Sequence, residues 1–132
     1  MSVGICYLDA SAFVKLLSPE RESIALKEFL EDHPGQTSSA ILDIEAHRVA
    51  TRLGPAVEAR VARLLAPLNL VPLNAEVRAL ARIVAPPALR TLDAIHLASA
   101  IGLGADLGVF VAYDNRLLEA AAQAGLPVAA PI

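Results

Sequence analysis

The stretch GICYLDASAFVK, residues 4–15, decides the fold prediction for this chain. Residues 4–8 form a short apolar run that predicts a buried strand, and Ser11 is a candidate N-cap for a helix over 12–17. Asp9 stands between the predicted strand and the predicted helix. Its carboxylate is either a turn or cap residue or the first ligand of a metal site, and the rest of the chain must decide between these roles.

Length and composition indicate one folded domain over residues 1–132. Hydrophobic residues make up 55% of the chain, which argues against disorder. No apolar run reaches the ~18–20 residues that a membrane helix needs. No signal-peptide pattern is evident, so we expect a cytoplasmic protein. A formal net charge of −3 gives no overall attraction to nucleic acid, although a local basic patch could still bind phosphates.

Predicted strands alternate with predicted helices along the chain. Further strands are expected at residues 36–38, 70–73, 108–113 and 127–130, and helices at 19–32, 40–53, 56–66, 75–84, 91–101 and 115–124. This alternation predicts an α/β fold with a mainly parallel sheet. In such sheets ligands bind beyond the carboxyl ends of the strands.

Two acids follow predicted strands at that edge of the sheet. Asp9 follows the run 4–8 and Asp114 follows the run 108–113, and each precedes a helical pattern. One helix cap does not require another. The repetition therefore favours a shared role for Asp9 and Asp114.

Two further acids lie on predicted helices. Glu45 borders an apolar stripe and should be half hidden, and the alternative is an ion pair with Arg48 worth a few tenths of a kcal/mol. The stripe consists of Leu42, Ala46, Val49 and Leu53. Asp93 begins a helix that is apolar nearly all round, where a carboxylate is costly without a compensating charge. The alternative for Asp93 is interaction with the helix dipole, about 0.3–1 kcal/mol.

Together the four acids predict a divalent metal site. Carboxylates brought close repel one another unless a cation holds them. Oxygen ligands suit Mg²⁺ or Mn²⁺, and such sites suit hydrolysis of phosphodiesters by an activated water. A zinc site is not expected. His47 should point away from Glu45 along the helix, and His96 is expected to pack or to hydrogen-bond structurally.

Four motifs resemble those of the PIN-domain ribonucleases, and most of all the VapC toxins of bacterial toxin–antitoxin pairs. They read YLDASAFVKLLSPE, SSAILDIEAHRVA, LDAIHLASA and VAYDNRLLEAA, in this order, and the resemblance spans essentially the whole chain. It implies a PIN-like three-layer α/β fold. It also implies that the metal ligands and catalytic acids are Asp9, Glu45, Asp93 and Asp114. The family commonly has a hydroxyl two residues after the first acid, here Ser11, and often one two residues before the last, where this chain has Ala112.

The resemblance further implies an RNA substrate, a homodimer and inhibition by a cognate antitoxin. The basic residues nearest the acidic motifs in sequence are Lys15, Arg48, Arg52, Arg90 and Arg116. Contacts from them to phosphates would be salt-dependent and largely independent of base sequence.

Two other functions remain as alternatives. A catalytically inactive PIN-like binding module would serve in protein or RNA assembly, and Ala112 in place of a hydroxyl is its only support. A phospho-acceptor receiver domain would want an acidic pair after the first strand, whereas Asp9 lies between Leu8 and Ala10.

Overall fold

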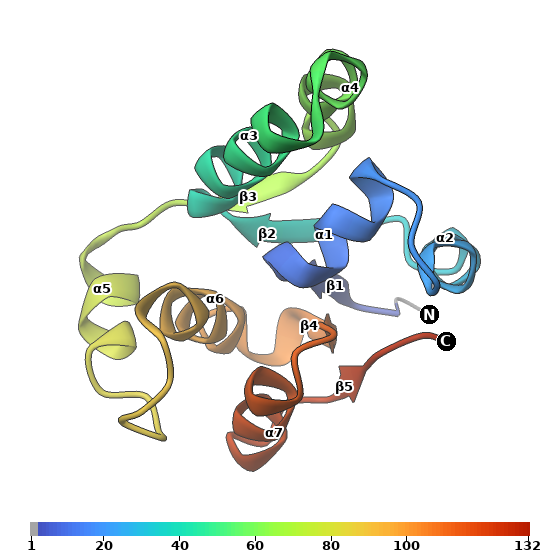
Figure 1. Cartoon of the computed structure of the whole chain (residues 1–132). Helices are drawn as coiled ribbons and strands as arrows, with labels where there is room; N and C mark the ends of the chain where they lie inside the picture. The colour runs from blue at the N-terminus through green and yellow to red at the C-terminus, as the bar shows by residue number, and fades with distance from the viewer. Residues whose placement is uncertain (1–2) are drawn as a thin grey trace.

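The computed structural model describes residues 3–132 and has a five-stranded sheet in the order β3-β2-β1-β4-β5 (Figure 1). The strands are β1 (Ile5–Leu8), β2 (Gln36–Ser39), β3 (Asn69–Val71), β4 (Leu107–Val111) and β5 (Val128–Ala129). Each strand pairs in parallel with its neighbours. The predicted α/β fold is confirmed, and this sheet is wholly parallel. The prediction of one domain over 1–132 includes residues 1 and 2, which lie outside the described part.

Helices cover both faces of the sheet and form the outer layers. They are α1 (Ala10–Leu17), α2 (Ser23–Glu31), α3 (Ile41–Leu53), α4 (Pro55–Leu65), α5 (Ala75–Ala81), α6 (Thr91–Ile101) and α7 (Asn115–Gln123), with the 3-10 turn η1 (Gly104–Asp106) before β4. Buried side chains place α1 and α2 against one face and α6 and α7 against the other, while α3 and α4 pack on α1. The three-layer arrangement is that of the predicted fold.

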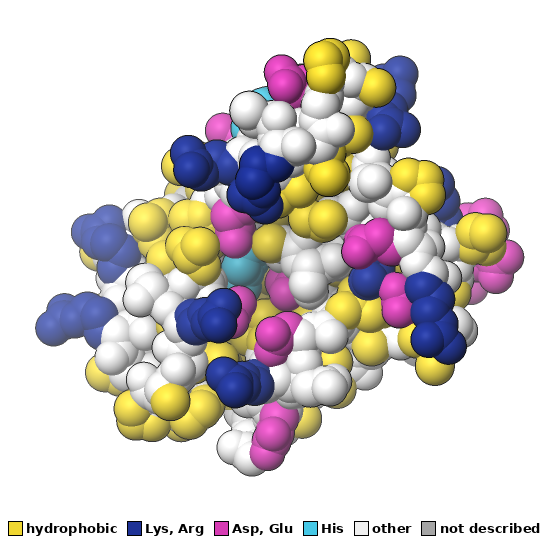
Figure 2. Space-filling model, viewed as in Figure 1, with side chains coloured by type: hydrophobic (Ala, Val, Ile, Leu, Met, Phe, Trp, Pro, Cys, Tyr) yellow, Lys and Arg dark blue, Asp and Glu magenta, His cyan; other side chains and the backbone are white. Residues whose placement is uncertain are grey.

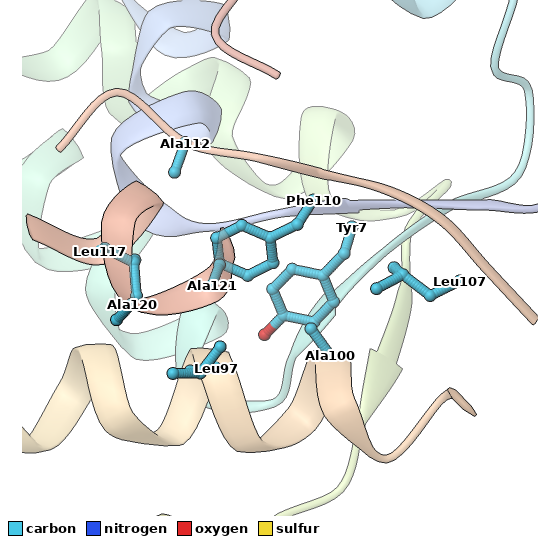
Figure 3. Close-up of a cluster of buried hydrophobic side chains, with 9 residues drawn as sticks. All are labelled: Tyr7, Leu97, Ala100, Leu107, Phe110, Ala112, Leu117, Ala120 and Ala121. Atoms are coloured by element: carbon cyan, nitrogen blue, oxygen red, sulfur yellow. The ribbon is translucent and has the colours of Figure 1, made fainter. Parts of the chain in front are cut away.

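The alternation of side chains along β1 explains why both faces are covered. Cys6 and Leu8 pack toward α1 and α2, whereas Tyr7 between them packs toward α6 and α7. On that second face the rings of Tyr7 and Phe110 stack with centroids 5.4 Å apart (Figure 3). Leu97 of α6 and Leu117 of α7 close over the two rings. The sheet is therefore buried on both sides, as wholly parallel sheets usually are.

Two predicted helix starts are wrong, the first because of a local cap and the second because of a contact between helices. Asp9, not Ser11, is the N-cap of α1, because its side chain accepts a hydrogen bond from the Ala12 amide. The second helix begins at Ser23 instead of residue 19. Ser18 instead ends α1, and the Ser23 hydroxyl donates to the carbonyl of Lys15 in α1, which anchors the start of α2 there.

The apolar stripe of α3 also differs from its prediction. Leu42 and Ala46 are buried as expected, but the stripe continues through Ala50, while Leu53 is 49% exposed. The chain turns at Gly54, and Pro55 starts α4 directly afterwards. None of the helices within residues 3–132 is long and apolar enough to cross a membrane.

The topology brings the ends of the strands together at one edge. Leu8 of β1 is in register with Val111 of β4, and the Asp9 amide donates to the Val111 carbonyl over 3.2 Å. Asp9 and the segment leading to Asp114 therefore leave the sheet side by side. β2 ends at the same edge, and α3, which carries Glu45, starts two residues after it.

Candidate active site

Asp9 is a buried carboxylate held by neighbours in its own turn. Its side chain is only 3% exposed. The Ser11 hydroxyl lies 2.7 and 2.8 Å from its two oxygens, and the Ala12 amide donates to Oδ1 over 2.9 Å. Burial raises the pKa of the Asp9 carboxyl, although the hydrogen bonds from Ser11 and Ala12 act in the opposite direction. Capping fixes the geometry of Asp9 but does not supply a compensating positive charge.

Ser11 joins the ends of two strands. Besides donating to Asp9, its Oγ accepts a hydrogen bond from the Tyr113 amide over 2.9 Å. The next residue, Asp114, caps α7 by accepting from the Leu117 amide over 3.0 Å. Ala112, where the resemblance expects a hydroxyl, is fully buried among apolar side chains. The hydroxyl that links the two acidic turns is therefore that of Ser11.

Glu45 has a partner that the sequence did not predict. Its Oε1 lies 2.8 Å from Nε2 of His96, rather than pairing with Arg48 as the alternative proposed. The other ring nitrogen of His96 lies 2.8 Å from the hydroxyl of Tyr7. His96 therefore makes the structural hydrogen bonds that were predicted for it, but one of them ends on a predicted site residue. His47 lies on the exposed side of α3, as predicted, with Nδ1 2.7 Å from the Asp43 carbonyl oxygen.

Asp93 faces Asp114 across a cavity of about 370 Å³ that both residues line. Burial raises the pKa of the Asp93 carboxyl, and the negative charge of Asp114 raises it further. The charge of Glu45 acts in the same direction, whereas His96 and Arg90 lower it. Asp114 and Glu45 thus both interact electrostatically with Asp93. His96 also interacts with the charge of Asp9.

The four acids share one region of the surface without forming a closed cage. Figure 2 shows a hollow on this face with a histidine at its base, acidic side chains around it and Lys or Arg side chains at its margins. Within residues 3–132, no three His, Cys, Asp or Glu side chains are grouped closely enough to hold a metal ion as they stand. Their mutual repulsion, seen in the raised pKa of Asp93, is what a cation would compensate. A donor set of carboxylates fits Mg²⁺ or Mn²⁺ rather than a thiolate-binding metal.

Two of the five candidate basic residues stand beside the acids. Arg90 and Arg116 line the same cavity as Asp93 and Asp114. Lys15 and Arg52 line an adjoining cavity of about 470 Å³ that also contains Ser11 and Asp114. The ammonium group of Lys15 is engaged, because it lies 2.7 Å from a carboxylate oxygen of Glu22 and above the ring of Tyr113. Arg90 and Arg116 are therefore the better placed to meet a phosphate near the acids.

Tyr7 is connected to the site through His96, and the sequence does not predict this connection. Tyr7 belongs to an apolar run, and its partner His96 is 89 positions away in the chain. No local pattern indicates that contact. The only indication in the sequence is that a buried Tyr usually needs a hydrogen-bond partner for its hydroxyl, which does not identify that partner.

Comparison with known proteins places this geometry in a family. The PIN domain family matches residues 6–123. Ribonuclease VapC46 of Mycobacterium tuberculosis is 43% identical over 125 residues, which cover 95% of this chain and 96% of the relative. Ribonuclease VapC47 of the same species is 39% identical over 130 residues, with the same coverage of both chains.

Solved structures share the fold at lower identity. A toxin–antitoxin complex from Klebsiella pneumoniae has a TM-score of 0.74 at 23% identity and covers 96% of this chain and 98% of its own. VapC20 of M. tuberculosis, described as a sarcin-ricin loop cleaving toxin, has a TM-score of 0.74 at 17% identity, with 96% and 99% covered. The family match spans most of the sequence, and the relatives are 39–43% identical. The chain therefore belongs to the PIN-domain family and, within it, to the VapC proteins.

Proposed function

We propose that this protein is an endoribonuclease that hydrolyses RNA phosphodiester bonds with Mg²⁺ or Mn²⁺ and acts as the toxin of a toxin–antitoxin pair. The observation that carries the proposal is that Asp93 and Asp114 line one cavity with Arg90 and Arg116, and that the charges of Asp114 and Glu45 both act on Asp93. The curated relatives are named ribonucleases and belong to the same family. An inactive binding module is not favoured, because the relatives that are 39–43% identical to this chain are named ribonucleases.

In this proposal each acid has a defined place. Asp9 and Asp93 would contact the cation directly, since Asp9 is fixed by Ser11 and the pKa of Asp93 is already raised by burial and by its acidic neighbours. Glu45 and Asp114 would complete the site, directly or through water. A bound divalent cation supplies a water of lowered pKa and neutralises charge on the phosphate.

The protein would also position the RNA through its arginines. Arg90 and Arg116 line the cavity that contains Asp93 and Asp114, so a phosphate held by their guanidinium groups lies next to the acids. Such contacts fix the backbone without reading bases. Because acids and arginines line the same cavity, a cation that neutralises the acids should strengthen binding of the RNA.

The activity is tested with purified protein and a mixed pool of structured RNA in Mg²⁺, Mn²⁺ or chelator. Asp9→Asn and Asp93→Asn should abolish cleavage while circular dichroism shows an intact fold. Asp43→Asn is the matched control, because the Asp43 side chain is 61% exposed on the outer side of α3. Full metal-dependent cleavage by either site variant would refute the assignment.

The partners follow from the same family membership. We expect a cognate antitoxin that inhibits the enzyme and a homodimer, in the cytoplasm where the RNA is. The structural neighbour from Klebsiella pneumoniae is a toxin–antitoxin complex. Expression alone should arrest growth of a bacterial host, and co-expression of the adjacent small open reading frame should restore it. Growth that is unaffected by the active protein would contradict a role as a toxin.

A further inference from the structure

A line of polar side chains runs from the hydrophobic core to the acidic hollow. The Tyr7 hydroxyl lies 2.8 Å from Nδ1 of His96, and Nε2 of His96 lies 2.8 Å from Oε1 of Glu45. Tyr7 is fully buried, the His96 side chain is 1% exposed and that of Glu45 is 18% exposed. The line therefore runs from Tyr7 in the buried core to Glu45 at the edge of the solvent-facing site.

The chemistry of the three groups sets the direction of the hydrogen bonds. An ionised carboxylate can only accept, so Nε2 of His96 donates to Glu45. In a neutral imidazole Nδ1 then carries the lone pair, and it accepts from the hydroxyl of Tyr7. Glu45 thus selects the ring tautomer of His96, and the Tyr7 hydroxyl satisfies and holds the nitrogen that remains.

The core holds this line in one place. The Tyr7 ring stacks on Phe110 with planes 8° apart, and the His96 ring meets the edge of Tyr7 with centroids 5.8 Å apart. Figure 3 shows the Tyr7 hydroxyl among the side chains that α6 and α7 contribute to this cluster. His96 is packed on every side and cannot turn its ring without disturbing the core.

Glu45 differs from Asp9 and Asp114 in needing such support. Asp9 and Asp114 are N-caps, and each accepts a hydrogen bond from a backbone amide of its own helix. Glu45 lies in the middle of α3, where the backbone amides are already used, and its side chain is longer and more mobile. The nitrogen of His96 does for Glu45 what the backbone does for the two aspartates.

We infer that Tyr7 and His96 are positioning residues that orient the carboxylate of Glu45 for the cation, a role that rests on the proposed function of the four acids. They act through Glu45 and do not touch substrate. Partners of metal-binding side chains typically contribute about 10–100-fold to metal affinity or activity. The same magnitude is expected for His96, and a smaller one, about fivefold, for the single hydrogen bond of Tyr7.

The test compares His96→Asn with His96→Gln. The amide of Gln reaches the position of Nε2 and keeps a donor for Glu45, whereas Asn reaches only the position of Nδ1 and leaves Glu45 without one. We expect His96→Asn to weaken Mn²⁺ binding, measured by calorimetry on the free protein, by about tenfold or more, and His96→Gln to recover most of it. Tyr7→Phe should weaken Mn²⁺ binding by about fivefold. Equal Mn²⁺ affinity in wild type and His96→Asn would overturn the inference.

A control separates positioning from general loss of stability. Ser23→Ala removes a buried hydroxyl that donates to the Lys15 carbonyl and accepts from the Glu20 amide, far from Glu45 in the fold. It should lower the thermal midpoint as Tyr7→Phe does and leave Mn²⁺ affinity unchanged. A parallel loss of Mn²⁺ affinity in Ser23→Ala would show that instability alone explains the Tyr7 and His96 variants.

The ring of His96 gives a readout that needs neither metal nor RNA. Nitrogen-15 spectra of the metal-free wild type should show Nε2 protonated and Nδ1 unprotonated, and Tyr7→Phe should shift the Nδ1 resonance because it removes the hydrogen bond to that nitrogen. A wild-type ring protonated at Nδ1 alone would refute the positioning role. A wild type with the expected ring but without Mn²⁺ binding or cleavage would instead refute the proposed function, and the role of Glu45 in holding a cation with it.

Discussion

Asp9→Asn should have opposite effects on stability with and without a divalent cation. In the metal-free protein an ionised Asp9 is buried and forms no salt bridge within residues 3–132, so Asn should be the more stable residue there. Asn can still cap α1 by accepting from the Ala12 amide. Desolvation of several kcal/mol, offset by the hydrogen bonds to the carboxylate, leaves a net gain on the order of 1 kcal/mol for the variant. For a domain of this size that is roughly 3–5 °C in thermal midpoint.

The cation should reverse this order. At a concentration a hundred times its dissociation constant, a ligand that binds only the folded state adds about 2.7 kcal/mol. Wild type should gain that amount from Mn²⁺ and Asp9→Asn little of it, so wild type becomes the more stable protein. The measurement is thermal unfolding by circular dichroism in chelator and in Mn²⁺, with Asp43→Asn as a control that should follow wild type in both. A variant that is less stable than wild type in chelator, or that gains as much from Mn²⁺, would refute this reasoning.

The difference in stability between wild type and Asp9→Asn in chelator should depend on pH. Burial raises the folded-state pKa of Asp9 above its ordinary value of 3.8. A carboxyl with a raised pKa stabilises the fold while it is protonated, and that contribution is lost as the pH rises through the folded-state pKa. The advantage of Asp9→Asn in chelator should therefore be absent below the ordinary pKa of 3.8 and grow with pH until the pH exceeds the folded-state pKa of Asp9.

Three further substitutions test the structure around the acids. Ser11→Ala should cost about 1–3 kcal/mol in urea unfolding, because the buried Tyr113 amide loses its acceptor and Asp9 loses a donor. Arg90→Ala and Arg116→Ala should each weaken RNA binding in chelator uniformly across sequences and reduce the slope of log K against log salt by about 0.7–1, measured by fluorescence anisotropy. Phe110→Ala should cost about 3–5 kcal/mol in thermal unfolding, since its ring fills the core against Tyr7.

Much of the fold could be predicted from local patterns, because the two central strands β1 and β4 are short apolar runs that are each followed by an acid and a helix. The helix over 91–101 was placed correctly at both ends, and Asn74 was correctly predicted to cap α5. The failures occur where a tertiary contact overrides a good local signal. Ser18 followed by Pro19 is a standard helix start, but in the fold Ser18 ends α1 and Ser23 hydrogen-bonds across to it.

The candidate site divides in the same way. Asp9 and Asp114 could be placed from sequence, because a carboxylate after an apolar strand of a parallel sheet must stand at the carboxyl edge. Glu45 and Asp93 were predicted from the cost of a charge beside apolar residues, which marks a residue as unusual but does not name its partner. The partner of Glu45 is His96, 51 positions away, and only the packing of α3 and α6 reveals it.

The four acids differ in how firmly hydrogen bonds fix their side chains. Asp9 is fixed by a hydroxyl and an amide, and Asp114 by an amide, so the acids at the strand ends are defined by the sheet itself. Glu45 is defined by the core through His96. Asp93 is half buried and repelled by its neighbours, and it has no comparable support among residues 3–132. Burial and the charges of Asp114 and Glu45 raise the pKa of the Asp93 carboxyl, and a cation would compensate those charges. Asp93 is therefore the acid whose position should respond most to metal, while the other three provide a frame that is already set.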